Sequence, residues 1–139
     1  MPIRLIPCSF LLALLCLATG CGENSDVVPV TGLVTLDDEP LSGVMIRFTP
    51  LEAEQRITSL GMTAADGSFQ LRFDSQRQGA LVGKHLVQVV RDPSAIDSDA
   101  PRPKRIPDHY SSGDSELTAE VTRGGSNHFE FALSSRKAR

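Results

Sequence analysis

The chain has 139 residues, which is room for one ordinary domain. Its 40% apolar and 22% charged residues exclude a disordered chain. Its formal net charge of -3 lacks the basic excess of a general nucleic-acid binder, so no nucleic-acid partner is expected.

The first twenty residues differ in character from the rest. Arg4 is the only charge in residues 1–20, and residues 9–18 read "SFLLALLCLA". This apolar run is too short for a membrane-spanning helix, which needs roughly 20 residues. A basic start, a short apolar centre and small residues at the end predict a secretory signal peptide over 1–20. A buried N-terminal helix is the alternative.

The cysteine that follows this segment, unlike the two inside it, would remain in the mature protein. Cys8 and Cys16 lie in the predicted signal peptide, which leaves Cys21 as the one thiol of the mature chain and allows no internal disulfide. The stretch "LATGC" resembles the bacterial lipoprotein signal, although Ala18 stands where Leu is commoner. That resemblance implies cleavage between Gly20 and Cys21 and attachment of lipid to Cys21. Ordinary secretory cleavage near Gly20 is the alternative.

Alternating apolar residues then run to the end of the chain and predict strands. The strands are expected over 28–36, 44–48, 58–63, 69–73, 117–121 and 129–133, and the stretch 79–90 is expected to end in one more. The turn at 64–67 should join the third and fourth strands as a hairpin. Residues 51–56 are expected to form a loop or one helical turn, 92–107 an exposed mobile loop, and no other helix is expected.

About seven short strands separated by turns predict an all-β fold, a seven-stranded antiparallel β-sandwich. The expected organisation is a signal peptide (1–20), a lipidated N-terminus and tether (21–27), the β-sandwich (28–135) and a basic tail (136–139). The tail contains Arg136, Lys137 and Arg139 and reads as a solvated end, with anionic lipid head groups as the alternative contact.

A family resemblance supports this fold. The stretch "VTGLVTLDDEPLSGVMIRFTP" is similar to the start of a carboxypeptidase regulatory-like domain, a seven-stranded sandwich related to transthyretin. The matching residues are Val30, Gly32, Val34, Pro40, Leu41, Gly43, Val44, Ile46, Phe48, Thr63, Asp66, Gly67, Phe69, Gly83, His85, Val87 and Val89. His85 stands where the family has tyrosine, and we expect it on the apolar face of its strand with one hydrogen bond. The resemblance covers about 28–90 and implies an accessory, adhesive or spacer module.

No catalytic or metal-binding motif accompanies the strands. The histidines His85, His109 and His128 lie far apart in sequence, without the short ligand spacing of a zinc site. The stretch "DGSF" lacks the alternating oxygen ligands of a calcium loop and predicts a turn, with Asp66 accepting backbone bonds and Gly67 at positive φ. We therefore expect no enzyme, no cofactor and no metal.

The expected function is that of a cell-envelope lipoprotein, anchored outside the cytoplasm through Cys21, with a non-catalytic binding, adhesion or structural module. Whether the inner or outer membrane holds it stays open. The expected partners are the membrane and other envelope proteins or polysaccharide, and Tyr110 as the one tyrosine, with no tryptophan, disfavours sugar stacking. The alternatives are a small-ligand or polysaccharide-binding protein, or a hydrolase with a pocket between the sheets.

Overall fold

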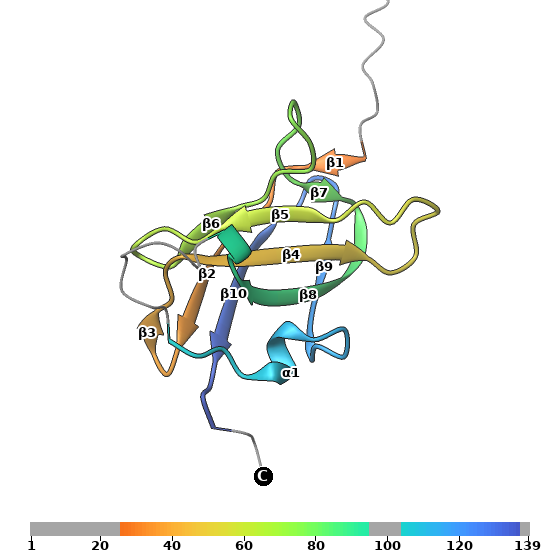
Figure 1. Ribbon diagram of the computed structural model, residues 1–139. Coiled ribbons are helices and arrows are strands. Elements are labelled where there is room, and N and C mark those ends of the chain that lie inside the picture. Colours follow the sequence, from red (N-terminus) through yellow and green to blue (C-terminus); the bar gives the residue numbers. More distant parts are fainter. Residues whose placement is uncertain (1–25, 95–103, 137–139) are drawn as a thin grey trace, which may run out of the picture.

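The computed structural model describes residues 26–94 and 104–136, and these form an all-β fold with one short helix (Figure 1). The elements in chain order are β1 (Val27–Val28), β2 (Thr31–Leu36), β3 (Glu39–Pro40), β4 (Val44–Pro50), β5 (Ser59–Met62), β6 (Ser68–Gln70), β7 (Ala80–Leu81), β8 (Gly83–Arg91), α1 (Asp108–Ser111), β9 (Leu117–Val121) and β10 (His128–Leu133).

The strands make two four-stranded sheets and one small pair. One sheet has the order β5-β4-β8-β9, with every neighbour antiparallel. The other has β2 at its centre, with β10 on one side and β3 and β6 on the other. In Figure 1, β4, β5 and β8 cross in front of β2 and β10 at a steep angle. The pair β1-β7 closes one end of the molecule.

The core lies between the two large sheets and follows the predicted alternation. In β4, for example, Val44, Ile46 and Phe48 are fully buried while the residues between them are partly exposed. Phe48 contacts the rings of Phe69, His85, Phe129 and Phe131, with centroids 5.7–6.4 Å apart. Phe48 therefore joins the inner surfaces of both sheets through aromatic contacts, which favour such tilted arrangements.

The predicted hairpin between the third and fourth strands is wrong. β5 pairs with β4, whereas β6 pairs with β2 in the other sheet. The two predicted strands meet at a bridge that joins β5 to the residues just after β6, where Leu60 and Arg72 exchange backbone hydrogen bonds of 3.0 and 2.7 Å. The turn at 64–67 thus carries the chain from one sheet to the other. The apolar side chains of Phe69 and Leu71, which follow this turn, are buried in the core.

That turn has the predicted chemistry. Gly67 has a φ of 81°, and its carbonyl oxygen accepts a 2.9 Å hydrogen bond from the Val34 N–H. Asp66 accepts bonds from the Ser68 hydroxyl and N–H at 2.6 and 3.0 Å, and these bonds hold the pKa of its carboxyl below the ordinary value. Both features belong to a turn that only glycine completes without strain.

One strand pair departs from the antiparallel arrangement that we predicted. β10 runs parallel to β2, from His128 opposite Thr31 to Leu133 opposite Leu36. The connection from β9 crosses between the sheets, so no hairpin constrains the direction of β10. Within this connection the Asn127 side chain exchanges two 2.9 Å hydrogen bonds with the backbone of Thr122.

The segment after β8 was expected to be an exposed loop, and the described part of it differs. Residues 95–103 lie outside the described residues, but Ile106 is buried at 6% exposure and α1 follows directly. The Tyr110 side chain packs against the core and its hydroxyl accepts a 3.2 Å bond from the Ser134 N–H. A four-residue helix is too short to produce an apolar period, so the sequence pattern missed it.

Within the described ranges, no helix has the length and apolar character needed to cross a bilayer.

We predict that Gly67→Ala lowers the free energy of unfolding by about 2 kcal/mol, because alanine is strained at positive φ. Its Cβ would also lie 2.5 Å from the Val34 carbonyl oxygen. Gly113→Ala is the matched control, since a Cβ at Gly113 meets nothing within 4 Å and should cost less than about 0.5 kcal/mol. Urea unfolding of both variants measures the difference, and equal midpoints would contradict the prediction.

Candidate functional site

The predicted lipid attachment and cleavage residues, Cys21 and Gly20, lie outside the described residues, as does the whole of 1–20. The described chain begins at Asp26, and this residue is fastened to the domain. Its carbonyl oxygen accepts a 2.7 Å bond from the Val82 N–H, and its carboxylate pairs with Arg123. β1 then pairs with β7, so the chain enters the fold at a defined point.

His85 is a core residue on the inner face of β8. It is 1% exposed, and its Nδ1–H donates a 3.0 Å bond to the Gly83 carbonyl oxygen, which fixes the tautomer because a carbonyl can only accept. Its Nε2 has no hydrogen-bond partner in the structure. Burial lowers the pKa of His85 below 6.5, against the opposing effect of the Gly83 bond. The one hydrogen bond expected for this residue is present.

The other two histidines lie on different elements. His109 is in α1 and packs its ring on Tyr110, with centroids 4.0 Å apart. His128 begins β10, where Nδ1 lies 3.0 Å from the Thr31 hydroxyl and Nε2 lies 4.0 Å from a Glu130 carboxylate oxygen. The three imidazoles therefore have separate partners. Within 26–94 and 104–136, no group of three or more His, Cys, Asp or Glu could hold a metal ion.

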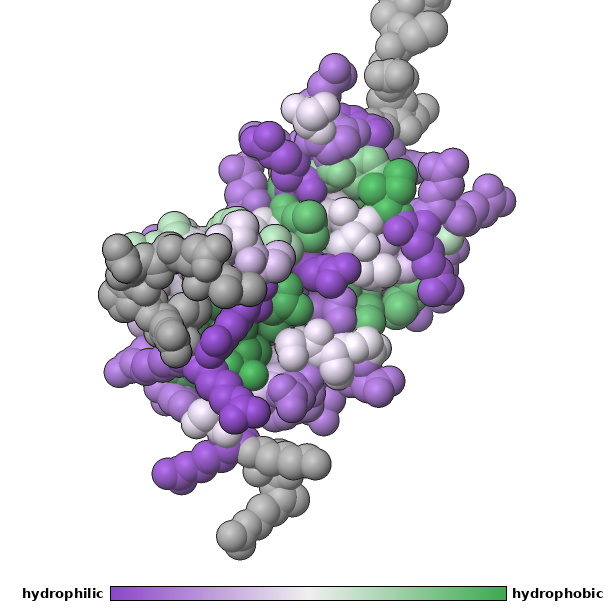
Figure 2. Space-filling model, viewed as in Figure 1, coloured by the Kyte–Doolittle hydropathy of each residue, from purple (hydrophilic) through white to green (hydrophobic). Residues whose placement is uncertain are grey.

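The outer face of the β5-β4-β8-β9 sheet carries apolar side chains at its β5 edge. Leu60 and Met62 of β5 are 41% and 43% exposed. Met45 of the neighbouring β4 lies opposite Met62 in the strand register and is partly exposed. Figure 2 shows apolar surface interspersed with polar side chains on the side of the molecule that bears β4 and β5. Contiguous exposed apolar surface marks interaction sites in soluble domains.

The inward positions of β5 explain why its large residues point outward. Ser59 and Gly61 are buried, and a Cβ on Gly61 would lie 2.7 Å from the Gln70 carbonyl oxygen and 3.2 Å from Leu71 Cδ2. The backbone of β6 therefore passes too close to β5 for a larger inward residue. Packing against β6 accounts for the small inward residues of β5. It does not account for Leu and Met at the outward positions, since strand positions that face solvent are ordinarily polar.

These apolar residues border a shallow hollow of about 480 Å³, which we call the β5 hollow. It is lined by Met45, Thr58, Leu60, Gly61, Met62, Gln70, Arg72, Phe73 and Asp74. The Arg77 guanidinium lies 4.5 Å from the centroid of the Phe73 ring and pairs with Asp74 at 2.6 Å. Because Arg72 already bonds both backbone groups of Leu60, a partner at the β5 hollow must contact side chains rather than add a strand there.

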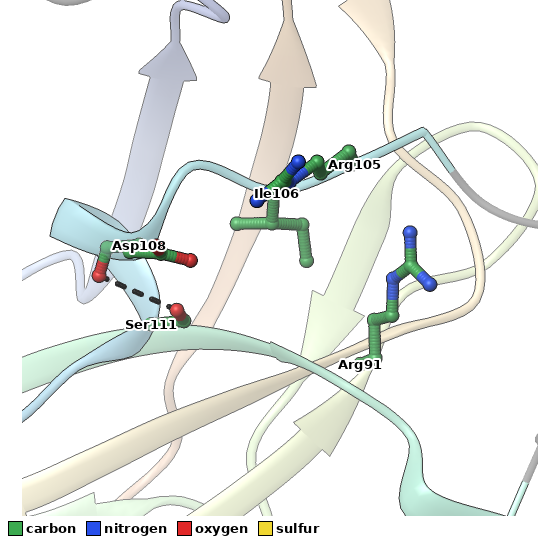
Figure 3. Close-up of a pocket in the computed structure, with 5 residues that line it drawn as sticks. All are labelled: Arg91, Arg105, Ile106, Asp108 and Ser111. Carbon is green, nitrogen blue, oxygen red and sulfur yellow. Dashed lines mark hydrogen bonds between the residues drawn. The ribbon is translucent and has the colours of Figure 1, made fainter.

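A second hollow of about 340 Å³ lies between the end of β8 and α1 (Figure 3). Arg91, Arg105, Ile106, Asp108 and Ser111 line it. The Ser111 hydroxyl donates a 3.3 Å bond to the Asp108 carbonyl oxygen. Two guanidinium groups and one carboxylate give this second hollow charges of both signs, and its lining does not select one class of ligand.

Sequence reasoning missed the β5 hollow, although one signal was present. In the stretch "SLGM" the large apolar residues alternate with serine and glycine, which is a strand pattern with its bulk on one face. The ordinary interpretation places that bulky face in the core. Only the passage of β6 beside Gly61 shows that the bulky face is the outer one.

We predict that the free energy of unfolding decreases as the pH falls below about 6.5, because the unfolded chain binds a proton that the buried His85 resists. The pKa of His85 is lower in the folded protein than in the unfolded chain. The stabilisation from the neutral, buried His85 is therefore complete above about pH 6.5 and is lost as the pH falls toward the pKa of the folded state. Chemical unfolding of wild type and His85→Phe between pH 5 and pH 8 measures this. An equal slope in both proteins would assign the pH dependence to other groups.

Comparison of the chain with protein-family models, with curated proteins and with solved structures finds no match. What the β5 hollow does is therefore inferred from its own side chains, their exposure and their place in the fold.

Proposed function

We propose that this protein is a cell-envelope lipoprotein, held outside the cytoplasm by lipid on Cys21, whose domain is a non-catalytic binding module for another envelope protein. The observation that carries the binding role is the exposed pair Leu60 and Met62 beside the β5 hollow. The anchor is supported by the "LATGC" stretch and by the short segment between Cys21 and the first docked residue, Asp26.

The domain is proposed to be a transthyretin-like sandwich of the carboxypeptidase regulatory-like type. Two four-stranded sheets that share one buried core support this assignment. The residues of the resemblance also have fitting positions: Gly32 has Phe129 and Phe69 atoms within 2.5 Å of an added Cβ, and Gly67 completes the turn. His85 occupies the tyrosine position as a buried side chain with one backbone bond. The parallel β2-β10 pair is a departure from an all-antiparallel sandwich.

Protein is the favoured partner because the chemistry of the β5 hollow suits side-chain contacts. Leu60, Met62 and Met45 offer flexible apolar groups, and methionine adapts well to a partner surface. Gln70 and Arg72 supply a polar rim, as protein interfaces have. An aromatic stacking platform for sugar would need exposed rings, and Phe73 is buried at 9% exposure.

The non-catalytic assignment is supported by the separation of the ionisable residues. His85 is enclosed between the sheets against Phe48, whereas His109 lies in α1 against Tyr110 and His128 lies in the edge strand β10 beside Thr31. The space around Phe48 is filled by its four aromatic neighbours, and both hollows lie at the surface. A hydrolase holds its nucleophile and base within hydrogen-bond reach beside a substrate pocket. The Thr31 hydroxyl does lie 3.0 Å from His128 Nδ1, but this pair is exposed on the sheet surface and lines neither hollow.

For the anchor, we predict that the mature protein from its native membranes begins at a lipid-modified Cys21. Intact-mass and N-terminal peptide mass spectrometry should find residues 1–20 removed and the mass of acyl chains added. Cys21→Ala should abolish the added acyl mass. An unmodified N-terminus in wild type would refute the anchor.

For the β5 hollow, we predict that a photo-crosslinking residue at Met62 captures one discrete envelope protein in intact cells. Thr118 is the matched control, because it is exposed on the outer face of the opposite edge strand of the same sheet. Leu60→Asp should lower the Met62 crosslink several-fold, because a carboxylate would have to lose water in an apolar contact. Equal capture from Met62 and Thr118, or capture that Leu60→Asp leaves unchanged, would contradict the proposed site.

A further inference from the structure

We propose that the end of the domain formed by β1, β7 and the loops 73–78 and 122–127 rests against the bilayer surface, with α1 and β3 turned away from it. This orientation rests on the proposed lipid anchor at Cys21 and adds to it an interaction surface whose partner is a phospholipid bilayer. Figure 1 shows these four segments together at one end and α1 and β3 at the opposite end.

The first step of the argument is the reach of the tether. Five peptide units separate the Cα of Cys21 from that of Asp26. Even fully extended they span at most about 18 Å. The lipid on Cys21 therefore cannot lie farther than this from the place where Asp26 docks.

The second step is that Asp26 is fixed to the domain. The Val82 N–H donates to its carbonyl oxygen at 2.7 Å, and Arg123 of the 122–127 loop pairs with its carboxylate. Val27 and Val28 then pair with Leu81 and Ala80. Because the fold holds the chain from Asp26 onward, the tether cannot lengthen by releasing β1 without breaking these contacts.

The third step concerns the surface that faces the lipid. Arg77 pairs with Asp74, and Arg123 pairs with Asp26, so the charges of each pair offset each other. Val82 is 38% exposed beside them. Such a surface has no strong electrostatic preference, and the tether rather than anionic lipid keeps it in place.

Two exposed serines provide a matched pair of probe positions. Ser126 lies in the 122–127 loop, before β10, and Ser135 follows the other end of β10. The six residues of β10 that separate these two positions span about 20 Å. The full lipidated protein would carry a fluorophore on Ser126→Cys or Ser135→Cys, because a thioether on Cys21 leaves no other thiol in the mature chain. Phosphatidylcholine vesicles with a nitroxide on the head group would quench the fluorophore.

We expect several-fold stronger quenching at position 126 than at 135, with no change when anionic lipid is added. A Gly/Ser insert of about 20 residues between Asn24 and Ser25, with a random-coil reach of about 25 Å, should remove the difference. Vesicle flotation with equal quenching at both positions would overturn the orientation while the anchor stands. Failure to float would refute the anchor, and the orientation with it.

Discussion

The close passage of β6 beside the inner side of β5 is the constraint on which the rest of this structure depends. It leaves no space for a Cβ at position 61, so the inward positions of β5 are small and the Leu60 and Met62 side chains face outward. The same passage places Phe69 and Leu71 in the core, where Phe69 reaches Phe48. One backbone contact thus keeps the inward positions of β5 small and closes the core on this side.

Much of the fold could be predicted from local pattern, because each long strand alternates cleanly. Val44, Ile46 and Phe48 are inward, as the period of two required, and the Asp66–Gly67 turn has the expected conformation. What the pattern could not provide is the pairing of strands. A turn signal such as "AADG" states that the chain reverses, but not whether the two strands it joins pair with each other or enter different sheets.

The candidate site was harder to predict than the fold, for a related reason. The hydrophobic period assigns Leu60 and Met62 to one face of a strand, but which face is inside depends on Gln70 and Leu71, which reach Gly61 only after the chain has changed sheets. Ile106 and Tyr110 were missed because an isolated buried residue and a single helical turn have no period. His85 was correctly placed, since its strand alternates without interruption and its backbone bond is local.

The parallel pairing of β2 with β10 has a consequence for how the chain reaches this structure. Thr31 and His128 are 97 residues apart and lie side by side, so β2, the central strand of its sheet, lacks one neighbour until β10 is present. Contacts of such long sequence separation close large loops and slow folding. A chain synthesised from its N-terminus therefore cannot complete this sheet until residues 128–133 have been added.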